Sequence, residues 1–80
     1  MGTVSNNLEV IDGFKSPGEL NRFERWLQRE VDAGCAVEVD VKNYYAGENF
    51  KERWFYFKEI DSVWRLVCPD GPFHGYWGAV

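Results

Sequence analysis

The sequence predicts an α+β domain in which one amphipathic helix packs on a three- to four-stranded antiparallel sheet. Two observations lead to this: a capped segment with helical spacing at residues 17–33, and two-residue alternation in the segments that follow, which short polar or glycine-containing connections separate. A chain of 80 residues encloses one hydrophobic core rather than two. We therefore expect residues 1–80 to form a single domain, with the small and polar residues 1–7 frayed at its start.

The helix has clear start and stop signals. The segment Ser16-Pro17-Gly18-Glu19 combines an N-cap serine, a proline at the first helical position and a glutamate that completes a capping box. Gly34 occupies the place of a C-cap glycine. Between these signals, apolar residues recur at spacings of three and four: Leu20, Phe23, Leu27 and Val31.

Three later segments alternate with the period of a strand. In residues 35–42 the valines alternate with Glu38 and Asp40, and we expect these two carboxylates to share the outward face. Residues 52–58 and 63–68 are joined by a short polar link, which predicts a hairpin. Residues 73–80 either fold back on the sheet or add a last strand. The following residues are expected to pack against the helix: Trp54, Trp64, Leu66, Phe73 and Trp77.

Composition restricts the class of function. The net charge of −4 repels a phosphate backbone, so direct binding of nucleic acid is disfavoured, and it suits attraction to a basic protein. Aromatic residues interleaved with Arg53 and Arg65 keep a single-strand stacking platform as an alternative. No apolar run approaches the roughly 20 residues that span a bilayer, and no signal peptide is seen. We expect a cytoplasmic protein with no membrane association.

The inventory of reactive residues is small. His74 is the one histidine, and no motif links it to a serine or cysteine nucleophile. Cys35 and Cys68 are expected to be free core residues, with a disulfide as the alternative, and with one histidine they are too few for a structural zinc site. No glycine-rich phosphate loop precedes a helix. We therefore expect neither an enzyme nor a metal or other cofactor.

The candidate site is a surface rich in carboxylates. Such surfaces accelerate encounters with basic partners, although ordinary solvated charges would look the same in the sequence. The predicted partner-binding residues are Glu38, Asp40, Glu48, Glu52, Glu59, Asp61 and Asp70.

A resemblance gives this surface a possible partner. The stretch Glu52-Arg53-Trp54-Phe55, the strand Trp64-Arg65-Leu66-Val67 and the closing segment Pro69-Asp70-Gly71-Pro72-Phe73-His74-Gly75-Tyr76-Trp77 resemble the C-terminal half of small bacterial immunity proteins from polymorphic or contact-dependent toxin systems. The resemblance implies a cytosolic inhibitor that binds a cognate toxin domain, often a nuclease. It transfers no binding residue, because partners differ between such families. The alternative is a small adaptor or homodimeric interaction domain, and both monomer and homodimer remain open.

Overall fold

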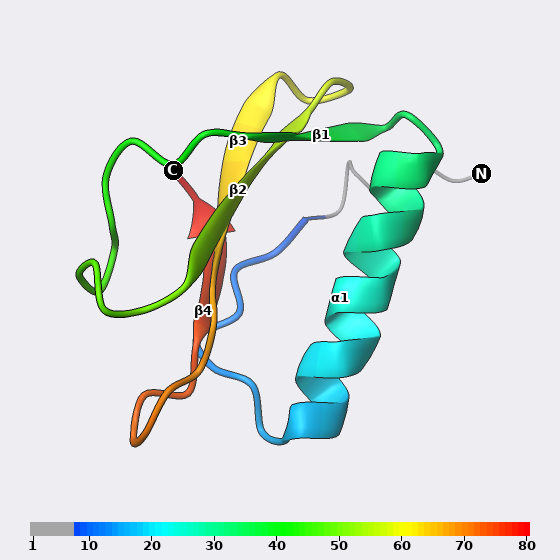
Figure 1. Cartoon of the computed structure of the whole chain (residues 1–80). Helices are drawn as coiled ribbons and strands as arrows, with labels where there is room; N and C mark the ends of the chain where they lie inside the picture. The colour runs from blue at the N-terminus through cyan, green and yellow to red at the C-terminus, as the bar shows by residue number, and fades with distance from the viewer. Residues whose placement is uncertain (1–7) are drawn as a thin grey trace.

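The computed structural model describes residues 8–80 and confirms the α+β fold (Figure 1). One helix is followed by four strands that form a single antiparallel sheet in sequence order. The elements are α1 (Pro17–Asp32), β1 (Ala36–Val39), β2 (Glu52–Phe57), β3 (Ser62–Val67) and β4 (Tyr76–Ala79).

Local capping sets the ends of α1, although the Glu19 carboxylate accepts the backbone N–H of Lys15 and not, as in the predicted capping box, that of Ser16. The Ser16 Oγ accepts the backbone N–H of Glu19 at 3.1 Å, and Pro17 occupies the first turn. The helix ends at Asp32, one residue before the predicted end, and Gly34 follows with a φ of 81°. A backbone bond from Cys35 N–H to Glu30 O, 2.9 Å long, then holds the start of β1 against the last turn of the helix.

The hydrophobic core lies between α1 and one face of the sheet. Register places Phe55 beside Trp64 and Leu66 beside Trp77 on this face, and all four are buried. The segment before the helix closes the open side of β4, because Ile11 and Trp77 exchange two backbone hydrogen bonds of 2.8 and 2.9 Å. The Trp77 ring therefore lies at the centre of the core.

The structure corrects the predicted faces of β1. We expected the valines of residues 35–42 on one face and Glu38 and Asp40 on the outward face, but β1 is shorter and Ala36 is its inward residue, at 1% exposure. Val37 is 42% exposed, and Glu38 lies on the same side of the strand as Ala36. The cause is the short connection from the helix, which brings the start of β1 close to α1, where alanine fits.

The second face of the sheet also has a partial cover. Residues 40–51, here called the covering segment, run from β1 to β2 as the long connection visible in Figure 1. Tyr45 of this segment stacks on Tyr76 of β4 with ring centres 4.3 Å apart. Trp54 is buried on this second face and not, as expected, against the helix. The sheet therefore has two packed regions, one on each side.

Candidate functional site

The outer face of the sheet, which points away from α1, divides into a covered half and an open half. Strand register assigns residues to this face by alternation with the core residues. The outer-face residues are Val37, Val39, Glu52, Trp54, Tyr56, Val63, Arg65, Val67, Tyr76 and Gly78.

Arg65 organises the covered half. Only 9% of this residue is exposed, and its Cζ lies 5.4 Å from the centre of the Trp54 ring and 5.7 Å from that of Tyr45. One terminal nitrogen donates to Asn43 Oδ1 at 3.1 Å, and the other lies 3.4 Å from the Glu52 carboxylate. These contacts connect the covering segment to β3.

Glu52, one of the predicted partner-binding residues, lies inside this cluster. Its side chain is 1% exposed. Besides the ion pair with Arg65, its carboxylate accepts the backbone N–H of Tyr45 at 2.8 Å and the Trp54 Nε1–H at 2.6 Å. The residue thus holds the covering segment in place, and its oxygens are occupied within the chain.

The open half carries a row of apolar side chains across the sheet. Val37, Tyr56 and Val63 are cross-strand neighbours, and Val80 follows β4 and donates its backbone N–H to Val63 O at 2.9 Å. We call these four residues the apolar row. Val37 is 42% and Val80 51% exposed, while Tyr56 and Val63 are half-buried. The helix α1 packs on the opposite face of the sheet, and the covering segment adjoins the row at Val63.

Two of the predicted carboxylates flank the apolar row. Asp61, in the turn between β2 and β3, accepts the Tyr56 hydroxyl at 2.8 Å, and this bond raises the pKa of Tyr56. Asp40 lies at the other side, where it lines a hollow of about 370 Å³ together with Val39, Lys42, Trp54 and Val63. The row is thus apolar in the middle and charged at its margins.

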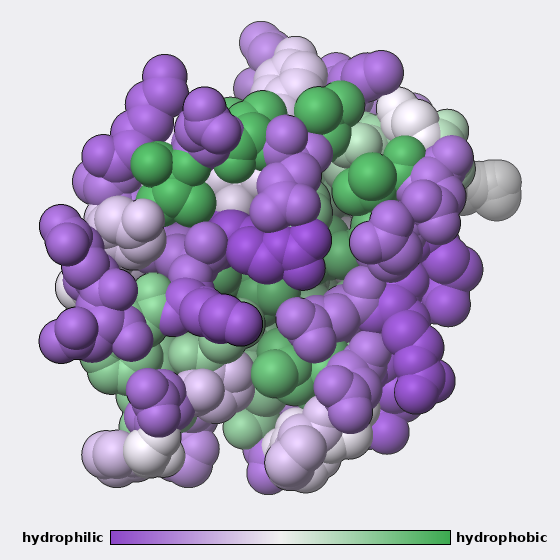
Figure 2. Space-filling model, viewed as in Figure 1, coloured by the Kyte–Doolittle hydropathy of each residue, from purple (hydrophilic) through white to green (hydrophobic). Residues whose placement is uncertain are grey.

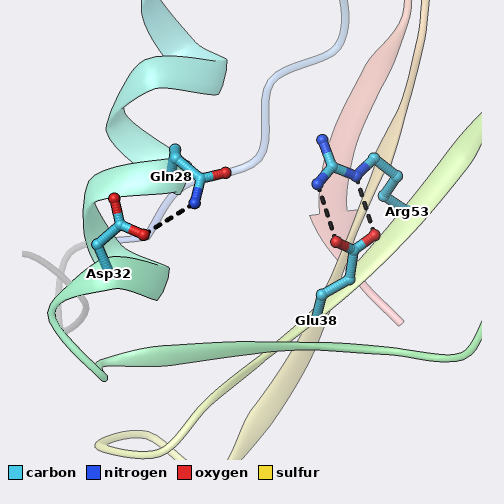
Figure 3. A network of polar contacts seen from close by, with 4 residues as sticks. All are labelled: Gln28, Asp32, Glu38 and Arg53. Atoms are coloured by element: carbon cyan, nitrogen blue, oxygen red, sulfur yellow. Dashed lines mark hydrogen bonds and ion pairs between the residues drawn. The ribbon is translucent and has the colours of Figure 1, made fainter.

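The remaining predicted residues lie elsewhere. Glu38 faces the helix side and forms a bidentate pair with Arg53, with both N–O distances 2.9 Å, opposite Gln28 and Asp32 of α1 (Figure 3). The hydrogen bond from Arg53 lowers the pKa of Glu38. Figure 2, in the view of Figure 1, shows hydrophilic side chains around separate apolar areas. The pair with Arg53, on the helix side of the sheet, thus assigns Glu38 to a different surface.

Three exposed carboxylates complete the predicted set. Glu59 shares the β2–β3 turn with Asp61, Glu48 lies in the covering segment, and Asp70 lies between β3 and β4, where its backbone pairs with Phe73. The seven predicted residues therefore do not form one patch. Asp40, Asp61 and Glu59 are the ones that lie near the open half of the outer face.

Reactive groups show no catalytic grouping in the part of the chain that the structure describes. Within residues 8–80 no cluster of three or more His, Cys, Asp or Glu side chains is placed to hold a metal ion. Cys35 and Cys68 are free, exposed and half-buried respectively, so neither is the buried residue we expected. Burial, and then the charge of Glu24, raise the pKa of Cys68, so its thiol stays protonated at neutral pH.

The fold and site define a small α+β domain with an open apolar row on the sheet face opposite its helix. Over residues 8–80, no helix has the length and apolar character needed to cross a membrane. Comparison of the chain with protein-family models, curated proteins and solved structures gave no match.

The apolar row was not predicted from the sequence, because the predicted binding residues were all carboxylates. The sequence nevertheless contained a signal, because β2 and β3 have apolar residues on both faces. Consecutive residues such as Phe55 and Tyr56, or Val63 and Trp64, point to opposite faces and are both apolar. A strand that faces water on one side alternates apolar with polar residues. Loss of that alternation indicates that the second face is covered, either by the chain itself or by a partner.

Proposed function

We propose that this chain is a protein-binding domain that docks on its partner through the open half of the outer sheet face. The observation that carries the proposal is the apolar row, which crosses the sheet from Val37 to Val80 and whose two end residues are 42% and 51% exposed. Contiguous apolar side chains with charged residues at their margin are typical of interaction surfaces.

The partner we propose is a cognate protein toxin, which this chain inhibits by direct binding. The segments 52–55, 64–67 and 69–77 together resemble the C-terminal half of bacterial immunity proteins, and the net charge of −4 favours encounter with a basic surface such as that of a nuclease. Asp40 and Asp61 would add steering at the margin of the row. An inhibitor of this kind acts in the cytoplasm. Cell fractionation tests this localisation.

Expression of the neighbouring open reading frame, with and without this chain, tests the inhibitor role. We expect the neighbour to arrest growth alone and to be tolerated when the wild-type chain is present. A neighbour that is harmless, or that stays toxic beside the wild-type chain, contradicts the proposed partner.

Paired variants test the proposed surface in the same assay. Val37→Asp combined with Val80→Asp places two charges on the apolar row, whereas Val10→Asp places one on an exposed valine of the segment before α1. We expect both proteins to fold, because these side chains are exposed, and only the row variant to lose protection. Full protection by the row variant would show that the toxin binds another surface.

The alternative is an adaptor or homodimeric interaction domain that uses the same face. The exposed part of the apolar row favours it, because two copies can cover each other's valines. Sizing chromatography over a concentration series separates the candidates. A shift from monomer to dimer that Val37→Asp abolishes supports the homodimer, and a constant monomer removes it.

A further inference from the structure

The solvent side of α1 carries a stripe of arginines in an otherwise acidic protein. Arg22, Arg25 and Arg29 are spaced by three and four residues, so they share one side of the helix and span about 10 Å along its axis. All three are exposed, and among residues 8–80 none of them has a carboxylate oxygen within ion-pair distance. We call these residues the arginine stripe.

An apolar groove adjoins the stripe at the start of the helix. A hollow of about 530 Å³ lies between α1 and the segment before it, lined by Ile11, Phe14 and Phe23 and by the charged residues Lys15, Glu19 and Arg22. A second hollow of about 250 Å³ shares Ile11 and Phe23 and extends the groove towards Trp26. Arg22 belongs to both the groove and the stripe, so the two features are continuous.

The rim of the groove carries the cations Lys15 and Arg22 and the carboxylates Glu19 and Glu9, and the arginine stripe adds two further cations beside Arg22. The Glu19 carboxylate already accepts the backbone N–H of Lys15 at 2.7 Å, in the first turn of the helix. The side chains of Lys15 and Arg22 remain at the rim without a carboxylate partner among the described residues. An apolar floor beside several cations fits a ligand that has an apolar group next to negative charges.

We propose that this helix side is a second docking surface, which binds an acidic segment of a partner protein. An apolar side chain of that segment occupies the groove, and its carboxylates pair with the arginine stripe. Guanidinium groups bind carboxylates through two parallel hydrogen bonds, which suits such a segment. The proposal does not rest on toxin inhibition, because the stripe and the apolar row lie on different sides of the molecule.

A protein segment fits this surface better than a nucleic acid does. The stripe offers three arginines, and the rest of the chain is acidic enough to give a net charge of −4, which repels a long phosphate backbone. A short acidic segment contacts only the stripe and avoids most of that repulsion. The groove also supplies apolar surface for an aliphatic side chain.

A titration of ¹⁵N-labelled protein with an acetylated Glu-Glu-Leu-Glu-Glu-Ile peptide tests the proposal. We expect amide signals of residues 11–29 to shift with a saturable curve that weakens as salt rises. A peptide with serine in place of leucine and isoleucine is expected to bind more weakly, because it lacks the side chain that fills the groove. Equal binding of the two peptides would overturn the role of the groove.

Matched charge variants locate the binding surface. The triple variant Arg22→Gln, Arg25→Gln and Arg29→Gln should weaken binding about tenfold, the sum of three exposed charge pairs. The triple variant Lys42→Gln, Lys51→Gln and Lys58→Gln removes the same charge from exposed positions elsewhere and should leave binding within about threefold. Circular dichroism confirms folding of both, and Arg→Lys at the three stripe positions should retain only part of the affinity, because lysine keeps the charge but cannot form the two parallel hydrogen bonds.

Three results would overturn the proposal. The first is the absence of any amide shift up to the solubility limit of the peptide. The second is an equal loss of binding in the two glutamine triple variants, which would indicate only a general effect of charge. The third is tighter, stripe-dependent binding of an oligothymidylate than of the peptide, which would assign the surface to nucleic acid.

Discussion

Arg65 is a charged side chain enclosed by protein on the face of the sheet that has no helix. Burial removes the guanidinium from water, which costs several kcal/mol unless a counter-charge and hydrogen bonds offset it. Glu52 supplies the counter-charge, Asn43 accepts a hydrogen bond, and the rings of Trp54 and Tyr45 add cation–π attraction. Arg65 and Glu52 therefore position the covering segment together, through Asn43 and Tyr45.

Removal of the Glu52 carboxylate should destabilise the fold strongly. We expect Glu52→Ala to lower the free energy of unfolding by about 3–5 kcal/mol, because Arg65 is left buried without its counter-charge. Replacing Arg65 by methionine in the same chain should recover much of this loss. Urea denaturation measures both, with Glu48→Ala, an exposed carboxylate of the same segment, as a near-neutral control. A loss below about 1 kcal/mol for Glu52→Ala would contradict the role of the pair.

Gly75 combines a positive φ with close packing just before β4. Its φ is 90°, and an added Cβ would lie 3.0 Å from Phe14, from Pro69 and from the Val67 carbonyl oxygen. Gly34 has a similar φ of 81°, but open space surrounds its Cβ position. A substitution at Gly34 therefore tests backbone strain alone, whereas a substitution at Gly75 adds steric crowding.

The alanine variants of these glycines should differ in stability. Both variants should lose about 1–2 kcal/mol because alanine disfavours the left-handed conformation, and Gly75→Ala should lose about 1–3 kcal/mol more through overpacking. Thermal melts of the two variants measure the difference. Equal melting temperatures would show that the neighbours of Gly75 move aside without cost.

At the scale of elements, Glu38 and Arg53 connect β1 with β2 beside the helix. The Arg53 hydrogen bond holds the pKa of Glu38 below its ordinary value of 4.5. The pair should therefore stabilise the fold above pH 4.5, and this stabilisation should be lost as pH falls through the lowered pKa. Because both side chains are well exposed, the contribution is at most about 1 kcal/mol.

A titration of the Glu38 side-chain carboxyl by NMR checks this dependence. Arg53→Gln should raise the pKa of Glu38 towards its ordinary value, because the charged hydrogen bond is removed. Lys51→Gln removes an exposed cation that forms no ion pair with Glu38 and should leave that pKa unchanged. An unchanged pKa in Arg53→Gln would mean that the pair does not persist in solution.

The elements differ in how far the sequence determines them. The ends of α1 follow from nearby residues, Ser16, Glu19 and Gly34, and were predicted to within one residue. The faces of β1 depend on whether Ala36 or Val37 fits beside the helix, which alternation does not reveal. The site has the same limit, because Glu38 and Glu52 look like free carboxylates until strand register brings an arginine to each.

At the scale of the whole molecule, the two sides of the sheet differ in what they present to a partner. The outer face presents the apolar row between Asp40 and Asp61, and the helix side presents the arginine stripe. The two surfaces proposed for docking therefore lie on opposite sides of the sheet, and the two proposals together place a different partner on each. The core between the two surfaces fixes their separation.

Trp77 contacts the helix, the sheet and the segment before the helix. Its ring contacts Phe23 and Trp26 of α1, Phe55 and Phe57 of β2 and Trp64 of β3. Its backbone pairs with Ile11 of the segment before the helix. Replacing the Trp77 side chain by a smaller one should therefore weaken the packing of the helix, the sheet and the segment before the helix together.

Trp77→Ala should consequently remove most of the stability of the protein. Loss of a fully buried tryptophan costs about 3–5 kcal/mol, and a chain of this length has about 4–12 kcal/mol in total. Circular dichroism and tryptophan fluorescence should lose native signal together during chemical denaturation, because the core is shared by all elements. Tyr44→Ala, at an exposed ring, should change stability by no more than about 0.5 kcal/mol. If Trp77→Ala lost less than about 1 kcal/mol, or if the helix melted apart from the sheet, the core would not be the single cooperative unit that these contacts indicate.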